Sequence, residues 1–214
     1  MEGMPDVLDP PLTAYLDGLV PDRHPELVEM EKYAASHDFP IVGPACAHIC
    51  YQVARMIGAR RIFELGSGYG YSTAFFAKAV QENGGGEVHH VVWDEDLSKK
   101  ARGHLATLGV DSVVRYHVAE AIATLKETPG PFDLIFDDIT KKDYPSSLTE
   151  IDRKLRPGGV LIVDNMLWSR RVMDLSDRTP DTEGVREMTR LLRQSSWITS
   201  LVPIRDGLLL ALKR

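Results

Sequence analysis

Apolar residues are arranged in two different ways along the chain. Before Gly58 they recur at helical spacing among charged residues, which predicts helices over Leu12–Val20, Pro25–His37 and Pro44–Ile57. Beyond Gly58, short and nearly continuous apolar runs alternate with stretches of helix length. Such runs are typical of parallel strands that helices cover on both faces. The pattern therefore predicts N-terminal helices followed by an α/β fold with a doubly wound sheet.

The expected parallel strands are Arg61–Leu65, Val88–Trp93, Val113–Val118, Phe132–Phe136 and Val160–Val163. The C-terminal part differs, because the apolar runs Ile198–Pro203 and Leu208–Lys213 flank Asp206-Gly207, a strong hairpin signal. We expect this hairpin to add an antiparallel pair to the sheet. Residues 1–57 are expected to form a helical cap segment and residues 58–214 the core, within one domain overall.

Length and charge narrow the range of functions. A chain of 214 residues with 43% apolar and 26% charged residues fits one α/β domain. The net charge of -6 and the lack of a Lys/Arg-rich block argue against a nucleic acid partner, because phosphate binding needs clustered positive charge. The first eleven residues do not resemble a secretory signal, and no apolar run is long enough to cross a bilayer. We therefore expect a cytoplasmic protein without a membrane partner.

Several reactive or aromatic side chains are assigned to the core. Cys46 and Cys50 lie four apart in an expected helix, and the spacings lack the further ligands that zinc would need. Trp93 and Tyr144 are expected to pack, although Tyr144 could also line a substrate opening. Three histidines within or beside strands are interpreted as structural: His89, His90 and His117.

A glycine-rich loop follows the first expected strand. It reads Glu64-Leu65-Gly66-Ser67-Gly68-Tyr69-Gly70-Tyr71-Ser72 and leads into an expected helix over Thr73–Val80. Glycines let the backbone approach a ligand, and the free N–H groups of a helix start attract an anionic group. The loop indicates a nucleotide-type cofactor, although a tight strand-to-helix turn explains the same glycines. Its Gly-x-Gly-x-Gly spacing differs from the Gly-x-Gly-x-x-Gly of dinucleotide-binding proteins.

Acids follow the second and third strands as well. Asp94 stands where an acid can accept hydrogen bonds from both ribose hydroxyls, although dehydrogenases share this acid and a solvated loop carboxylate is the alternative. Ala119-Glu120 stands where an adenine edge would meet the protein, and Glu120 could accept from the exocyclic amine. An acid at a helix start has an equally good structural explanation.

Polar residues also follow the fourth and fifth strands. Because the carboxyl ends of parallel strands meet at one edge, Asp138 and Asp164-Asn165 can converge beside the glycine loop. Two carboxylates and an amide oxygen suit Mg²⁺, Mn²⁺ or Ca²⁺, with water and substrate oxygens in the remaining positions. Lys141 could aim its ammonium at the same place. Taken singly, Asp164 or Asn165 could cap a helix and Lys141 could be a solvated charge, but their joint occurrence favours a site.

Such a site could ionise a phenol. A phenol has a pKa near ~10, so its ionisation at neutral pH costs about 4 kcal/mol. Metal coordination removes several pK units, and an adjacent ammonium adds a favourable charge interaction. No histidine base is then required.

These motifs resemble those of the metal-dependent catechol and caffeoyl-coenzyme A type O-methyltransferases. The similarity extends from the glycine loop through Phe132–Tyr144 and Leu155–Trp168 to Asp206-Gly207-Leu208. Its most specific parts are the Asp-x-x-Lys of Asp138–Lys141 and the Asp164-Asn165 pair. The resemblance implies S-adenosylmethionine as cofactor, a seven-stranded, mostly parallel Rossmann-like sheet, and transfer of a methyl group to a metal-bound hydroxyl of a catechol-like small molecule.

The resemblance also implies roles for single residues. It makes Asp138, Asp164 and Asn165 metal ligands, and Lys141 the group that deprotonates or holds the hydroxyl. Val42-Gly43 resembles the family's segment that closes over the methionine carboxylate. The expected cofactor-binding residues are Val42, Glu64, Gly66, Tyr69, Gly70, Ser72, Asp94, Ala119, Glu120 and Asp138.

The chain departs from the family's usual pattern in three places. The family has Glu where Asp94 stands, Gly-Asp where Ala119-Glu120 stands, and an apolar residue where Asp137 stands. Asp137 leaves the register of the first metal ligand open by one residue. The spacing to Lys141 favours Asp138.

Alternatives in other functional classes remain. The first is a metal-independent methyltransferase that acts on another nucleophile, with the acids in structural roles. A nicotinamide-dependent oxidoreductase is disfavoured by the glycine spacing and the terminal hairpin, and a non-catalytic ligand-binding module is the third reading. We also expect a two-fold homodimer, because the helices before Pro40 display Leu27, Met30 and Tyr33 beyond the needs of the sheet.

Overall fold

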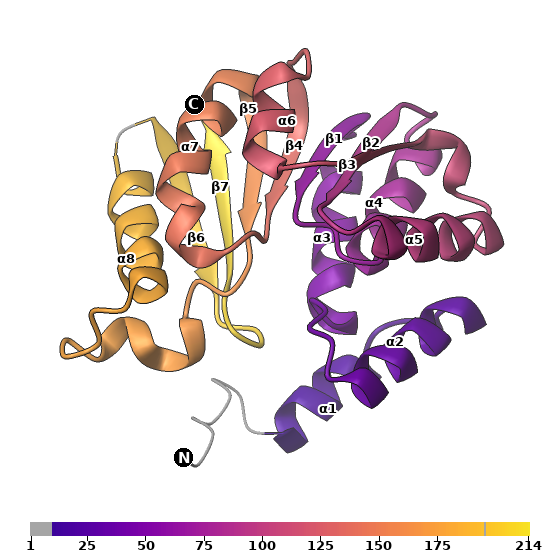
Figure 1. Cartoon of the computed structure of the whole chain (residues 1–214), viewed down its shortest axis with the longest axis horizontal. Coiled ribbons are helices and arrows are strands. Elements are labelled where there is room, and N and C mark those ends of the chain that lie inside the picture. The colour runs from indigo at the N-terminus through magenta and orange to yellow at the C-terminus, as the bar shows by residue number, and fades with distance from the viewer. Residues whose placement is uncertain (1–9, 195) are drawn as a thin grey trace.

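Seven strands form one mixed sheet in the structure, a computed structural model that describes residues 10–194 and 196–214 (Figure 1). The strands are β1 Arg61–Leu65, β2 Glu87–Val92, β3 Val114–Val118, β4 Phe132–Asp137, β5 Leu155–Val163, β6 Trp197–Val202 and β7 Leu208–Lys213. Their order is β3-β2-β1-β4-β5-β7-β6. β1 to β5 pair in parallel, whereas β7 pairs antiparallel with both β5 and β6. This confirms the predicted doubly wound sheet with a terminal antiparallel hairpin.

Helices cover both faces of this sheet. The α-helices are α1 Pro10–Gly18, α2 Pro25–His37, α3 Pro44–Met56, α4 Tyr71–Glu82, α5 Glu95–Thr107, α6 Ala121–Glu127, α7 Tyr144–Lys154 and α8 Pro180–Leu192. Short 3-10 helices are η1 Asp111–Val113, η2 Lys141–Asp143 and η3 Trp168–Met173. One apolar core joins the sheet to α3, α4 and α5, and the other joins it to α6, α7 and α8. Coverage of both faces explains why the central strands are continuously apolar.

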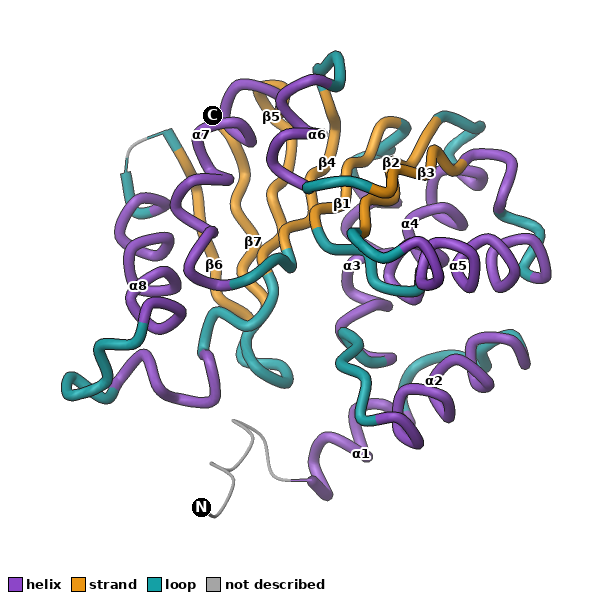
Figure 2. Tube along the Cα trace, viewed as in Figure 1, coloured by secondary structure: helices purple, strands orange, loops and turns teal. Residues whose placement is uncertain are grey.

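The carboxyl ends of the parallel strands define one edge of the molecule. The turn between β6 and β7 lies at the same edge, because Val163 at the end of β5 pairs with Leu209 near the start of β7. Figure 2 shows the loops that leave β1, β4 and β5 on this edge, together with the β6–β7 turn. Residues far apart in the sequence are therefore brought together there.

Some strand ends differ from the sequence expectation. β2 ends at Val92, so Trp93 lies beyond the sheet and is 74% exposed; the expectation that it packs was wrong. β5 begins already at Leu155, which pairs with Phe132 before an irregularity in the register. The assignment of Cys46 and Cys50 to the core is confirmed, since both are fully buried.

The N-terminal helices are part of the same apolar core. Met30 is fully buried, and Leu27 and Tyr33 pack against the core that α3 and α4 share. These three residues, on which the dimer prediction rested, therefore already have partners within the chain. Tyr15 of α1 and Leu19, which directly follows α1, are instead exposed. Within the described residues, none of the helices combines the length and the apolar character needed to span a membrane.

Candidate active site

Three cavities meet at the carboxyl edge of the parallel strands. We name them the β5-side cavity of about 590 Å³, the α4-side cavity of about 40 Å³ and the β2-side cavity of about 230 Å³. Gly66 and Asp138 line all three. Most of the other predicted site residues line one of them: Lys141, Asp164 and Asn165 the first, Val42, Tyr69 and Ser72 the second, and Ala119 and Glu120 the third. Glu64, Gly70 and Asp94 line none of the three.

The glycine loop allows the three cavities to share the space at Gly66 and Asp138. Gly66 has a φ of +87°, and a Cβ atom there would lie 2.5 Å from the carbonyl oxygen of Asp138. A side chain at position 66 would therefore displace Asp138. Gly70, with a φ of +93°, precedes α4 and approaches Ala101 of α5. The loop thus brings the start of α4 and the end of β4 to the same cavities.

Glu64 lies beneath the loop and is fully buried. Its Oε2 atom accepts a hydrogen bond from the Thr73 hydroxyl, whereas Oε1 has no partner among the described residues. Burial raises the pKa of Glu64 to about 7. The structure therefore places one unsatisfied acceptor below the loop, outside the walls of the three cavities.

The α4-side cavity is bounded by the loop and by the segment before α3. Val42 and Ser72 both line it and come from different segments. Val42 lies just before α3, and Ser72 lies in the first turn of α4. Tyr69 also lines it, but the Tyr69 hydroxyl donates to the Met30 carbonyl oxygen at 2.8 Å. Tyr69 therefore forms a wall and ties the loop to α2.

Two of the predicted acids, Asp94 and Glu120, cap the helices that follow β2 and β3. Glu120 accepts hydrogen bonds from the backbone N–H groups of Ile122 and Ala123 and also lines the β2-side cavity. Asp94 accepts from the N–H groups of Asp96 and Leu97 through Oδ1, at 2.7 and 3.1 Å. Asp94 does not belong to the lining of the three cavities. The structure brings Ala119 and Glu120 to this cavity but leaves Asp94 outside.

Lys141 is held in the wall of the β5-side cavity. Its Nζ atom lies 2.8 Å from Asp138 Oδ1 and 3.2 Å from the Ile139 carbonyl oxygen. The side chain is only 11% exposed, and Nζ lies 5.3 Å from the centre of the Tyr144 ring. A buried ammonium fixed in this way presents one positive charge at a defined place.

Asp164 faces the same cavity at the end of β5. Its Oδ1 atom accepts from the Asn165 backbone N–H at 2.8 Å. Burial, together with the like charge of Asp138, raises the pKa of Asp164 to about 7. Asn165 has a φ of +56°, which Asn tolerates better than most residues. The carboxylates of Asp138 and Asp164 are therefore close enough to repel each other.

Asp137 and Asp138 have different surroundings. Asp137 is fully buried, its Oδ2 accepts from the Ser147 hydroxyl of α7, and burial raises its pKa to about 7. It lines none of the three cavities, whereas Asp138 lines them all. Alternation along β4 thus directs the first acid into the core and leaves the second at the cavities.

Part of the remaining wall of the β5-side cavity comes from Trp168 and Arg205, residues to which the sequence analysis gave no role. η3 contributes Trp168, and three successive residues there have positive φ, namely Trp168, Ser169 and Arg170. Arg205, from the β6–β7 turn, also lines this cavity and donates a hydrogen bond to the Ile41 carbonyl oxygen. The sequence analysis predicted the hairpin, but no residue pattern predicts the contact of Arg205 with Ile41.

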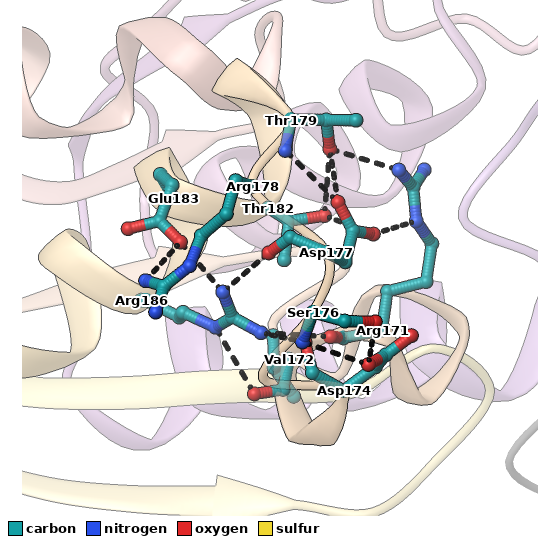
Figure 3. A network of polar contacts seen from close by, with 10 residues as sticks. All are labelled: Arg171, Val172, Asp174, Ser176, Asp177, Arg178, Thr179, Thr182, Glu183 and Arg186. Carbon is teal, nitrogen blue, oxygen red and sulfur yellow. Dashed lines mark hydrogen bonds and ion pairs between the residues drawn. The ribbon is translucent and has the colours of Figure 1, made fainter.

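A polar network holds η3 against α8 (Figure 3). The Arg186 guanidinium donates to the carbonyl oxygens of Val172, Asp177, Arg171 and Asp174. Asp177 accepts from Arg171 and from the hydroxyl groups of Thr179 and Thr182. Non-glycine residues at positive φ persist only where the surrounding structure enforces them. The Ser169 backbone N–H donates to Asp206 Oδ1, and the network holds the residues that follow in η3.

No group of three or more His, Cys, Asp or Glu side chains within residues 10–194 and 196–214 is arranged to hold a metal. Asp138, Asp164 and Asn165 provide two carboxylates and one amide. A cation at this place would need water or substrate oxygens to complete its coordination.

Comparison with known proteins identifies the fold's relatives. A model of the O-methyltransferase family matches residues 20–214. The chain belongs to this family. Like its relatives it is an S-adenosylmethionine-dependent O-methyltransferase with a Rossmann-like sheet.

Individual relatives of this O-methyltransferase cover most of its length. A catechol O-methyltransferase of Niastella koreensis is 29% identical over 181 residues, which are 80% of this chain and 81% of the relative. The catechol O-methyltransferase domain-containing protein 1 of Mus musculus is 30% identical over 213 residues, 96% of this chain and 80% of the relative. The structure of TomG from Streptomyces achromogenes, an O-methyltransferase in tomaymycin synthesis solved with S-adenosylmethionine, has a TM-score of 0.85 and 28% identity, covering 95% of this chain and 96% of TomG.

Proposed function

We propose that this O-methyltransferase transfers the methyl group to a catechol-like hydroxyl in the β5-side cavity, with a divalent metal ion held by Asp138, Asp164 and Asn165. The observation that carries the proposal is the position of Lys141, Asp138 and Asp164 around one cavity that adjoins the α4-side and β2-side cavities at Gly66. The α4-side cavity would then hold the methionine part of the cofactor and the β2-side cavity its nucleoside.

The donor set fits a hard divalent cation. It consists of oxygen atoms only, which Mg²⁺, Mn²⁺ and Ca²⁺ prefer. Burial and the charge of Asp138 make the ionised form of Asp164 unfavourable, and a bound cation would remove that repulsion. When bound, a divalent cation supplies Lewis acidity, which lowers the pKa of a coordinated hydroxyl.

The residues of the chain have separate tasks in this reaction. The Lys141 ammonium donates a hydrogen bond to the substrate oxygen and stabilises it as its proton is lost to solvent, because the Nζ atom lies in the cavity wall and is fixed by Asp138. Tyr144 is fully buried under Lys141 and donates to the Asp164 carbonyl oxygen at 2.9 Å, so it orients the end of β5. Trp168 shields the cavity from water on the η3 side. Bond formation then depends on the alignment of the substrate oxygen with the methyl carbon.

The cofactor-binding part of the proposal rests on the other two cavities. Val42, Gly66, Tyr69 and Ser72 surround the methionine part, with Gly70 supporting the turn and Glu64 lying beneath the loop, where it accepts from the Thr73 hydroxyl. Ala119 and Glu120 lie beside the adenine. Asp94 can reach a ribose hydroxyl only through Oδ2, because Oδ1 caps α5.

A metal-independent methyltransferase is the second candidate. It is favoured by the ion pair between Lys141 and Asp138, since the ammonium already neutralises one of the two carboxylates that a metal would need. In that case Lys141 alone would stabilise the ionised nucleophile.

Purified protein with methyl-labelled S-adenosylmethionine and a panel of catechols and single phenols distinguishes the candidates. We expect methylation of catechols with Mg²⁺, loss of activity with a chelator or in Asp164→Ala, and a rise in Tm on addition of Mg²⁺ that Asp164→Ala abolishes. Asp152→Ala is the matched control, because Asp152 is an α7 acid outside the three cavities. Full activity of the chelated enzyme would establish the metal-independent candidate instead.

We also propose a two-fold homodimer, now through α1 and the residue that follows it, because the side chains of Tyr15 and Leu19 are each 63% exposed. Light scattering at micromolar concentration tests it, and a monomer mass would refute it.

A further inference from the structure

We propose that a separate cavity between α3 and α4 is a second ligand site, which binds a small aromatic carboxylate. We name it the α3–α4 cavity. Its volume is about 350 Å³, and it is lined by the connection between α1 and α2, by α3 and α4, and by the segment after α5. It shares no lining residue with the three cavities at the carboxyl edge of the strands. Methyl transfer therefore does not account for it.

Helix α4 separates this cavity from the cofactor. Ser72, in the first turn of α4, lines the α4-side cavity, whereas Lys78 and Gln81 line the α3–α4 cavity. At a rise of about 1.5 Å per residue, Lys78 lies about 9 Å further along the helix than Ser72. Ligands at the two places can therefore bind to the same helix without competing for space.

Much of the lining of the α3–α4 cavity is apolar. Ala74 and Phe75 of α4 and Val110 after α5 are buried, and Leu27 and Leu108 pack against the same core. Apolar walls with a small number of polar groups are typical of cavities that bind small molecules, and this volume lies within their usual range. The Phe75 ring offers an aromatic ligand a partner for ring contacts.

The polar side of the cavity presents hydrogen-bond donors. The Lys78 Nζ atom lies 5.4 Å from the centre of the Tyr51 ring and has no carboxylate partner among the described residues. The His48 ring stacks on Tyr51 at 5.7 Å and makes no hydrogen bond with a described residue. Burial and the charge of Lys78 lower the pKa of His48, so the ring stays neutral and keeps one N–H donor. An ammonium with an N–H donor nearby favours a carboxylate.

Two other charged groups of the lining already have partners. The Arg23 guanidinium donates to both carboxylate oxygens of Glu31, at 2.7 and 3.0 Å, and Glu82 accepts from the Tyr51 hydroxyl. Asp22, the other acid of the lining, is exposed on the connection between α1 and α2. A ligand amine would bind near Asp22 instead of Lys78, so the charge of the ligand distinguishes the two ends of the cavity.

Calorimetric titration of the full chain with 2-naphthoate tests the inference. A matching cavity should give a probe of this size a Kd of about 1 mM or lower. The probe 2-naphthylmethylamine has the same rings and the opposite charge, and it should bind at least about fivefold more weakly. Lys78→Ala should weaken naphthoate binding by about fivefold, or about 1 kcal/mol, the upper end for an exposed ion pair, whereas Lys78→Arg should stay within about twofold. Lys126→Ala is the matched control, because Lys126 is an exposed helix lysine outside this cavity.

Two further measurements locate the bound probe. Lys78→Ala should keep the wild-type affinity for S-adenosylhomocysteine, which shows that the variant is folded, and Lys141→Ala should keep the wild-type affinity for naphthoate. The proposal is overturned if wild type does not bind naphthoate, if the amine binds as tightly, or if Lys78→Ala binds naphthoate as tightly as wild type. Loss of naphthoate binding in Lys141→Ala alone would place the probe in the β5-side cavity and also overturn it. A mass by light scattering that changes in Lys78→Ala would assign this surface to contact between copies of the chain instead.

Discussion

Gly184 provides a test of how precisely Lys141 must be placed. Glycine inside a helix is unfavourable by about 0.5–1 kcal/mol relative to Ala, so its presence within α8 calls for a packing reason. The structure supplies one, since a Cβ atom at position 184 would lie 2.2 Å from the Lys141 carbonyl oxygen and 2.8 Å from the Lys142 Cα. Helix α8 can therefore pack directly on the turn that carries Lys141.

The Gly184→Ala substitution should push that turn away from α8. Ordinary contacts of a carbon atom begin at about 3.5 Å, so the Lys141 backbone must move by at least about 1 Å. Overpacking of this size costs about 1–3 kcal/mol of stability, and a misplacement of 1 Å can cost about 10²-fold in rate. We expect kcat to fall by about that factor, while affinity for S-adenosylhomocysteine changes little because Gly184 and Lys141 line neither cofactor cavity.

The assay combines kcat, calorimetric affinity and Tm for Gly184→Ala and for Gly103→Ala. Gly103 lies inside α5, and a Cβ atom there meets nothing within 4 Å. Gly103→Ala should raise Tm and leave kcat unchanged, because it adds a good helix former without a clash. If Gly184→Ala retains the wild-type kcat, Lys141 does not depend on the fit between α8 and its turn.

Three further predictions concern single side chains. Lys141→Ala should lower kcat by about 10²- to 10⁴-fold, keep its affinity for S-adenosylhomocysteine and recover partly at high pH; a rate that stays flat with pH contradicts a role in ionising the substrate. Asp94→Asn keeps the helix cap but removes the Oδ2 acceptor, so binding of S-adenosylhomocysteine should weaken by about 1.5–3 kcal/mol at constant Tm. Unchanged affinity in calorimetry would mean that Asp94 serves only as a helix cap. Burial lowers the pKa of His90 to about 3, so its neutral form stabilises the fold fully above pH 6.5, and this contribution is lost as the pH falls towards 3. Between pH 7.5 and pH 5 the free energy of unfolding of His90→Gln, measured with denaturant, should therefore fall by about 2 kcal/mol less than that of wild type. Equal falls in the two proteins would refute this.

Periodicity and local motifs were sufficient to predict the sheet, the glycine loop and the carboxyl-edge position of Asp138, Asp164 and Lys141. These features depend on neighbours in sequence or on a general property of parallel strands. The predicted end of the second strand at Trp93 was wrong, because an apolar residue after a strand has the same appearance in the sequence whether it packs or faces a ligand. The contact of Arg205 with residue 41 and the fit of Gly184 against Lys141 join distant segments, and no local pattern records them.

The order of the last strands has a consequence for the order of folding. β7 lies between β5 and β6, so β6 cannot join the sheet before β7 has paired with β5. Until then the Trp197 ring has no completed core to enter. The turn that carries Arg205 is likewise not fixed before β7 pairs. A folding chain therefore acquires the last wall of the β5-side cavity, which Arg205 lines, only when β7 has taken its place in the sheet.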